Sequence, residues 1–255
     1  MNDKAPAHHG FWCACDAIVS ATLQTWAALT YSRTIVCLAN SRKYSGRCIA
    51  GLELNGSEPK GWIRPVSSAP KGELQFEHLY VDGGEPELLD LIQVEFLQPR
   101  PAFCHREDHL INAKACWTRR GALRREELVS AIEPEAGCLW FDGGSTKFGI
   151  NDKIPADAAA QLTSSLKLVQ PKSLFIKVQS EGGPYRQARN VIRGFFSLAG
   201  FDYTFSVTDG AIEREFLDAR PGATKYLRSP LLCLSVSELF ESQNACYKLI
   251  AGVIA

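Results

Sequence analysis

The sequence predicts a mainly β protein with a few short helices, built as two small β-barrels in tandem. Three observations predict this class. Most apolar runs are short and rich in β-branched and aromatic residues, which favour strands. The run Phe201–Thr208 (FDYTFSVT) alternates apolar and polar residues, as a strand with one buried face does. No regular helices separate the runs, so a parallel doubly wound sheet is not expected.

The overall composition is that of a globular protein. The chain has 255 residues, enough for two small domains, and 28 basic against 28 acidic side chains give a formal net charge of zero. This balance argues against strong, indiscriminate binding to phosphate backbones. Nine cysteines without a C-x-x-C pair predict free, buried thiols in a reducing cytosol. No apolar run has the roughly 18 residues of a membrane helix. We therefore expect a cytoplasmic protein with no membrane partner.

The second half, residues 171–255, predicts a complete small barrel. Three strand patterns come first, a helix pattern follows, and two strand patterns end the chain. They are the strands Leu174–Gln179, Asn190–Ser197 and Phe201–Thr208, the helix Ala211–Ala219, and the strands Leu231–Val236 and Cys246–Ile254. A single helix between the third and fourth strands is the order of an OB barrel. The main alternative is a helical Cys246–Ile254, because periodicity alone does not assign so short an apolar run.

The first half, residues 33–170, repeats this pattern with long inserts and predicts the other OB-like barrel. Its expected elements are the strands Thr34–Ala39, Cys48–Leu54, Gly61–Val66 and Leu89–Leu97, the helix Arg124–Ile132, and a closing strand at Ser165–Val169. Segments 67–88 and 98–118 carry Gly, Pro and charge, so we expect them to be loops. Residues 1–32 fit neither barrel and predict a poorly ordered or loosely packed N-terminal extension.

Five stretches of the chain follow one another in an order that is specific as a set. They are Cys37–Leu52 (CLANSRKYSGRCIAGL), Gly61–Ser67 (GWIRPVS), Leu89–Pro101, Phe205–Gly210 (FSVTDG) and Leu232–Ile254. In these stretches the chain resembles the bacterial dual OB-containing domain family, from about Arg33 to the C-terminus. The resemblance implies two tandem OB folds. It also implies nucleic-acid or nucleotide binding, as an inference from the fold.

The strongest candidate site is the basic turn between the first two expected strands. Arg42, Lys43 and Arg47 supply charges that suit phosphate, and Tyr44 supplies a ring that can stack on a base. In an OB barrel the loop between the first two strands borders the ligand face. The alternative is a solvated hairpin tip with ordinary charges.

Trp62 and Arg64 form the second candidate. They lie two residues apart in a strand, so their side chains point to the same face. An exposed Trp beside an Arg is a stacking platform for a base. The alternative is a core Trp62 with Arg64 in a structural ion pair, with Asp90 or Glu95 as the partner.

Arg119 and Arg120 belong to the densest basic cluster, which also contains Arg124 and Arg125. Such a cluster can follow a phosphate backbone. It can equally be a solvated face of the molecule.

These features predict a nucleic-acid-binding protein that favours single-stranded DNA or RNA and has no catalysis, cofactor or metal of its own. No Walker loop, G-x-S-x-G motif or zinc-hydrolase spacing of histidines occurs in the sequence. The alternative is a sensor of a nucleotide-like ligand or a protein–protein adaptor, in a bacterial defence or stress system. In that alternative the second barrel supplies the contact with a protein partner.

Overall fold

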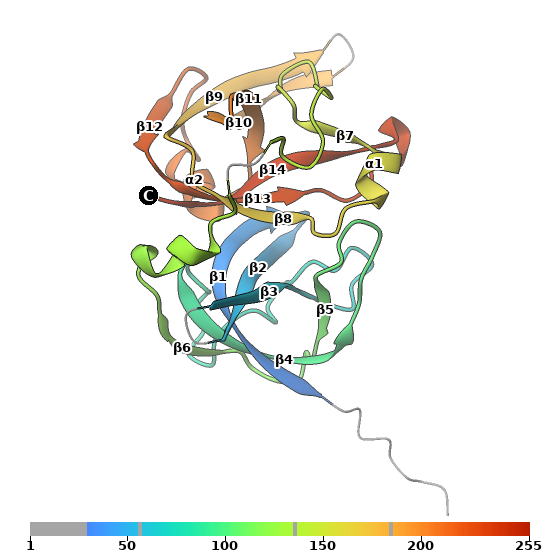
Figure 1. Ribbon diagram of the computed structural model, residues 1–255, viewed down its shortest axis with the longest axis vertical. Coiled ribbons are helices and arrows are strands. Elements are labelled where there is room, and N and C mark those ends of the chain that lie inside the picture. The colour runs from blue at the N-terminus through green and yellow to red at the C-terminus, as the bar shows by residue number, and fades with distance from the viewer. Residues whose placement is uncertain (1–29, 56–57, 135–136, 184–185) are drawn as a thin grey trace, which may run out of the picture.

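The computed structural model describes residues 30–55, 58–134, 137–183 and 186–255, and these form two β-sheets stacked along the long axis of the molecule (Figure 1). The predicted N-terminal extension lies outside the described residues up to residue 29. The last two residues assigned to it, Tyr31 and Ser32, instead begin the first strand and pair with Phe96 and Glu95.

The first sheet closes into a barrel with OB strand order. Its strands are β1 (Tyr31–Lys43), β2 (Gly46–Asn55), β3 (Glu58–Val66), β4 (Asp90–Pro99), β5 (Asp108–Ile111) and β6 (Thr118–Ala122). The order is β1-β2-β3-β5-β4, and β4 pairs back with β1. The pair β3–β5 is parallel and the other pairs of the barrel are antiparallel. Because β6 adds to β4, it lies outside the closed ring.

The second sheet repeats this strand order, but its first and last barrel strands do not pair with each other. Its strands are β7 (Lys153–Pro155), β8 (Leu166–Val169), β9 (Ser173–Gly183), β10 (Arg186–Leu198), β11 (Phe201–Val207), β12 (Thr224–Arg228), β13 (Leu231–Val236) and β14 (Ala245–Ile254). The run β9-β10-β11-β14-β13 matches an OB barrel, with β11 and β14 parallel. In the described chain, β9 pairs with β12 and β13 pairs with β8, rather than with each other. The predicted fold class is confirmed.

Four short helical segments complete the described part of the fold. They are the 3-10 helices η1 (Arg125–Ala131) and η2 (Glu241–Gln243) and the α-helices α1 (Ala156–Ala160) and α2 (Gly210–Glu215). Asp209 caps α2, since its side chain accepts hydrogen bonds from the backbone N–H groups of Ala211 and Ile212 at 2.9 and 2.8 Å. Its other carboxylate oxygen accepts from Val253 N at 3.0 Å, which ties α2 to β14.

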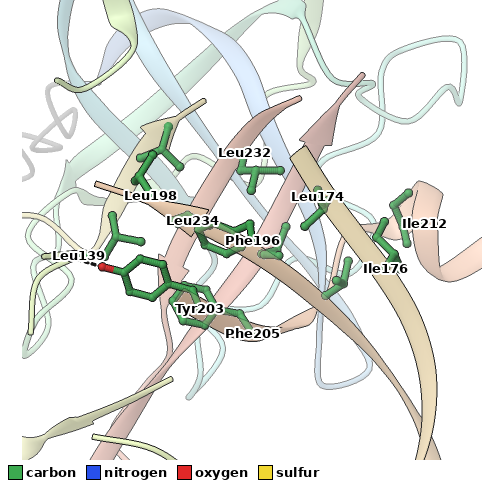
Figure 2. Packing of buried hydrophobic residues seen from close by; sticks show 13 residues of the cluster. Leu139, Leu174, Ile176, Phe196, Leu198, Tyr203, Phe205, Ile212, Leu232 and Leu234 are labelled. Carbon is green, nitrogen blue, oxygen red and sulfur yellow. Dashed lines mark hydrogen bonds between the residues drawn. The ribbon is translucent and has the colours of Figure 1, made fainter. Parts of the chain in front are cut away.

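The core of the second barrel is built around three aromatic rings. Phe196 of β10 stacks on Tyr203 of β11 at 5.3 Å between ring centroids, and Phe205 meets both rings edge-on. Figure 2 shows these rings packed against Leu232 and Leu234 of β13. The Tyr203 hydroxyl accepts a hydrogen bond from Leu139 N at 3.2 Å, so its buried polar tip is satisfied.

A separate core joins the two barrels, and we call it the seam core. It lies between the outer faces of β1 and β2 and those of β8, β13 and β14. Its fully buried members are Val36, Leu38, Ala39, Ala50, Leu52, Leu128, Leu166, Leu168, Leu231, Cys233, Ala251 and Ile254. Each fully buried Leu, Ile or Val side chain contributes about 1.5–3 kcal/mol relative to an exposed one. The barrels therefore form one packed unit.

The seam core explains why β1 and β13 read as continuous apolar runs. In β1, Ile35 and Cys37 face the interior of the first barrel, whereas Val36 and Leu38 face the seam core. In β13 all six residues are buried for the same reason. A strand buried on both faces loses the apolar–polar alternation of a surface strand.

The structure corrects one predicted strand role and adds four strands. Residues 165–169 were expected to close the first barrel, but β8 pairs with β13 of the second sheet. The strands β5, β6, β7 and β12 had no clear sequence signal, and β5 falls in a segment expected to be a loop. In contrast, β14 is a strand over its whole length, as predicted.

Candidate functional site

The basic turn is a tight hairpin held on both sides. Lys43 of β1 pairs with Gly46 of β2, which leaves Tyr44 and Ser45 at the tip, and Tyr44 has a positive φ of 51°. Arg47 exchanges two backbone hydrogen bonds with Leu74, at 2.8 and 2.9 Å. A side chain at Gly46 would place its Cβ 2.3 Å from the Leu74 carbonyl oxygen, so only glycine allows this approach. The segment after Leu74 is thereby fixed beside the hairpin.

A cavity of about 390 Å³ opens between the hairpin and this segment, and we call it the hairpin pocket. Its lining residues are Arg42, Tyr44, Ser45, Gly46, Arg47, Gln75, Phe76, His78 and Glu85. Two of the rings at this pocket are solvent-exposed, Tyr44 by 58% and Phe76 by 79%. Large exposed rings beside a concave surface are unusual unless they serve a contact.

His78 is buried in the wall of the hairpin pocket without a hydrogen-bond partner. It is 2% exposed, and neither ring nitrogen bonds to any described residue. Burial lowers the pKa of His78, and the nearby Arg47 adds to that direction, although Glu85 opposes it. The neutral imidazole offers one donor and one acceptor. A buried polar group of this kind costs free energy while it stays unsatisfied.

The cations of the hairpin are paired with carboxylates from distant parts of the chain. Arg42 bonds Glu213 of α2 at 2.9 Å, and Arg47 lies 3.5 Å from Glu85. Lys43 bonds Glu238 at 2.9 Å. Such exposed or half-exposed pairs are worth less than about 1 kcal/mol each, so an incoming phosphate can compete for the cations.

Glu238 also positions the Tyr44 ring. The Tyr44 hydroxyl donates to a Glu238 carboxylate oxygen at 2.9 Å. Burial works against the charged form of Glu238, but Lys43, Tyr44 and Lys71 outweigh it and hold the pKa of Glu238 below its ordinary value. The carboxylate therefore stays ionised and anchors the ring at its hydroxyl end.

A second cavity, which we call the junction cleft, lies on the other side of the hairpin, between the two barrels. Its volume is about 210 Å³. Arg42, Lys43 and Tyr44 line it as well as the hairpin pocket, so the hairpin separates the two cavities. The floor is formed from both barrels, including Arg64 and His105 of the first and Ser235, Leu249 and Ala251 of the second.

Arg64 is a buried structural cation rather than an exposed stacking partner. It is 2% exposed, pairs with Glu107 and Asp108 at 3.0 Å each, and donates to Ser165 Oγ at 2.7 Å. Burial disfavours its charge, but the two carboxylates outweigh burial and raise the pKa of Arg64. Two carboxylates share one guanidinium, and burial raises the pKa of Asp108 to about 6. The partners Asp90 and Glu95 considered from the sequence are wrong.

Trp62 does not form an open platform either. It packs half-buried against the seam core, on the outer face of β3. The outer face of strands 2 and 3 is where OB folds commonly bind oligonucleotides. In the first barrel the second half of the chain covers this face. The predicted exposed stacking pair Trp62 and Arg64 is therefore corrected, because neither side chain lies on an open face of β3.

Arg119 and Arg120 lie on β6, and neither lines the hairpin pocket or the junction cleft. Arg119 bonds the buried Asp90 at 2.7 Å, and Arg120 Nε donates to Gln93 at 2.8 Å. The structure thus brings together Arg42, Lys43, Tyr44 and Arg47 of the predicted site residues. Of the other four, Arg64 lies buried in the floor of the junction cleft, whereas Trp62, Arg119 and Arg120 line neither cavity.

Sequence reasoning missed Phe76 and His78, which come from a segment expected to be a plain loop. The one available signal was a large aromatic residue in an otherwise polar insert (GELQFEH), since an isolated Phe in a loop usually has something to contact. Nothing in the sequence pairs this insert with the hairpin, which lies about 30 residues earlier.

Two further properties bear on the kind of site. Within the described ranges, no group of three or more His, Cys, Asp or Glu side chains is arranged to hold a metal ion. The same part of the chain contains no helix long and apolar enough to cross a membrane.

A family model described as a dual OB-containing domain matches residues 33–253, which is most of the chain. No curated protein matches the sequence.

Proposed function

The chain belongs to the dual OB-containing domain family, and on that premise we propose that it binds single-stranded DNA or RNA, with one nucleotide of the strand held in the hairpin pocket. We propose further that it acts in the cytoplasm, without catalysis or a cofactor of its own. The cysteines in the described part of the chain are free thiols. Burial raises the pKa of both Cys37 and Cys233, which suits inert thiols in a reducing compartment.

The observation that carries this proposal is the chemistry gathered around one cavity. Tyr44 and Phe76 offer two exposed rings for stacking, which suits any base because every base has a π-face. Arg42 and Arg47 offer guanidinium groups for a phosphate. Gln75 offers an amide for hydrogen bonds to the edge of a base. The pocket also sits at the loop between strands 1 and 2, one of the ligand loops of OB folds.

A nucleotide-like small ligand is the second candidate. It is favoured by the carboxylate partners of Arg42 and Arg47, which limit the free positive charge available to a long backbone. The formal net charge of zero points the same way. For such a sensor the hairpin pocket would be the complete site, and nucleotides beyond the first would add no affinity.

Replacement of the Tyr44 ring tests the proposal. We expect Tyr44→Ala to weaken binding of a fluorescein-labelled oligothymidylate or oligouridylate of about 16 nucleotides, the upper site size of an OB fold. Loss of one stacked base costs about 1–3 kcal/mol, which is roughly 5- to 150-fold in Kd. Fluorescence anisotropy at fixed salt measures the change.

Tyr44→Phe is the matched control, because it keeps the ring and removes only the hydrogen bond to Glu238. It should weaken binding less than Tyr44→Ala. Equal binding by the parent and Tyr44→Ala would contradict the proposal. If a mononucleotide competes as well as the oligomer at equal concentration, the small-ligand alternative replaces it.

A further inference from the structure

The second barrel carries a row of aromatic residues across three neighbouring strands. Phe175 of β9 stands directly opposite Tyr226 of β12 on one side and Phe195 of β10 on the other. Directly opposite residues of antiparallel strands project from the same face of a sheet. We call Tyr226, Phe175 and Phe195 the aromatic row.

The aromatic row points away from the barrel core. The neighbours of Phe175 in β9, Leu174 and Ile176, both lie in the core of the second barrel. Side chains alternate along a strand, so Phe175 is on the outer face. Tyr226 is 61% exposed and Phe175 is 39% exposed, and the centroids of the Phe175 and Phe195 rings are 6.0 Å apart.

Folding alone gives little reason for these rings. A cross-strand aromatic pair contributes about 0.2–1 kcal/mol relative to an alanine pair. Tyr226 leaves most of its surface in water, so it adds little burial. Two exposed rings beside the half-buried ring of Phe195 form an apolar surface that soluble proteins generally keep for a contact.

Positive charge flanks the aromatic row. Lys177 lies two residues after Phe175 on the same face of β9, and Arg228 lies two residues after Tyr226 on the same face of β12. Neither forms an ion pair with a carboxylate in the described part of the chain, in contrast to the hairpin cations. Free cations beside exposed rings match a polyanion that carries flat bases.

The position of the aromatic row in the fold points to the same ligand. Phe195 lies on β10, the second strand of this barrel, and strand 2 belongs to the usual OB ligand face. The neighbouring part of that face is closed, because Arg193 pairs with Glu181 at 2.6 Å and with Asp152 at 3.5 Å. The open part of the face therefore runs from β10 over β9 to β12.

We propose that the aromatic row is a second contact surface for the single strand, on which two or three successive bases stack while Lys177 and Arg228 contact phosphates. Sheet aromatics hold bases in this manner in RNA-recognition domains. The inference takes the class of ligand, a single nucleic-acid strand, from the proposed function. The aromatic row lies on the second barrel, and none of its residues lines the hairpin pocket.

The test compares the double variant Phe175→Ala/Tyr226→Ala with the parent full-length chain. The probe is a fluorescein-labelled oligothymidylate of about 16 nucleotides, measured by anisotropy. We expect Kd to rise at least about 5-fold, the lower limit for loss of one stacked base. Phe201→Ala is the matched control, since Phe201 is exposed but lies on β11 outside the aromatic row, and Kd should not change.

A second variant keeps the inference testable if the double variant folds poorly. Lys177→Gln/Arg228→Gln leaves the rings in place and should reduce the salt dependence of binding by about two phosphate contacts. Unchanged affinity and salt slope in both double variants would overturn the claim that the aromatic row contacts the strand. If Tyr44→Ala weakens binding in the same assay, the proposed function still stands. Absence of binding by the parent chain would overturn both.

Discussion

Arg64 shows how burial decides what a charged residue does. Its guanidinium neutralises part of the charge on Glu107 and Asp108 in a position that water does not reach. A buried ion pair adds little stability relative to apolar side chains, but removal of one partner leaves an uncompensated charge. Arg64 therefore links β3 to β5 through its ion pairs and is not available to bind nucleic acid.

Arg64→Met should consequently unfold the protein more easily. We expect a loss of about 3–5 kcal/mol in the free energy of unfolding, measured by urea denaturation. Arg42→Met is the control, since its pair with Glu213 is exposed and should cost less than about 1 kcal/mol. A stable Arg64→Met protein with impaired binding would show that Arg64 contacts the ligand after all.

The sequence predicts the residue types of the hairpin site but not their partners. Arg42, Lys43, Tyr44 and Arg47 come from one turn, and the turn is visible as a polar break between two apolar runs. Glu213 and Glu238 lie far along the chain, and only the packing of the two barrels brings them to the turn. Ion pairs between distant segments leave no local periodic signal, so these could not be predicted.

At the scale of elements, β1 and β14 cross closely enough to require a glycine. A Cβ on Gly252 would lie 2.0 Å from the Leu38 carbonyl oxygen, a contact that real Cβ atoms do not make. The outer faces of the two strands therefore approach backbone to backbone in the seam core. This approach places the hairpin at the end of β1 against β11 and α2, where Arg42 N donates to the Thr208 carbonyl at 3.0 Å.

Gly252→Ala should force the two strands apart. We expect a loss of about 1–3 kcal/mol in the free energy of unfolding, because extra volume in a packed core displaces backbone. Gly61→Ala is the matched strand control, since nothing lies within 4 Å of a Cβ built there and Gly61 is exposed. Its effect should stay within about 0.5 kcal/mol. Equal stability of both variants in urea would show that the seam is looser than described.

Strands that contain an apolar run were predictable from the sequence, whereas the short strands β5, β6, β7 and β12 were not. The strands β1, β2, β4, β10, β11 and β14 contain apolar or alternating runs long enough to identify. The strands β5, β7 and β12 have three to five residues, and β6 (TRRGA) contains no apolar residue larger than alanine. Their pairing comes from the closure of each sheet. The role of β8 was misassigned because an apolar strand next to two barrels fits either one by pattern alone.

At the scale of the whole molecule, the seam core determines which surfaces can bind a ligand. It covers the outer face of β2 and β3, so the first barrel presents its hairpin pocket instead of its usual OB face. The second barrel has part of its own face closed by the segment that contains Asp152, and its open part carries the aromatic row. The fold class was predictable because each half of the chain contains the strand order of an OB barrel within its own sequence. The covered face was not, because it depends on how the barrels pack.

The most direct test of the central claim is to locate the bound strand by photocrosslinking. An oligonucleotide of about 16 residues with 5-iodouracil in place of thymine is irradiated with the full-length chain, and crosslinked peptides are identified by mass spectrometry. Iodouracil couples to aromatic side chains in contact with the base, so we predict crosslinks in the peptides that contain Tyr44 and Phe76. Crosslinks confined to peptides outside residues 40–47 and 74–78 would contradict the claim that the hairpin pocket holds the strand.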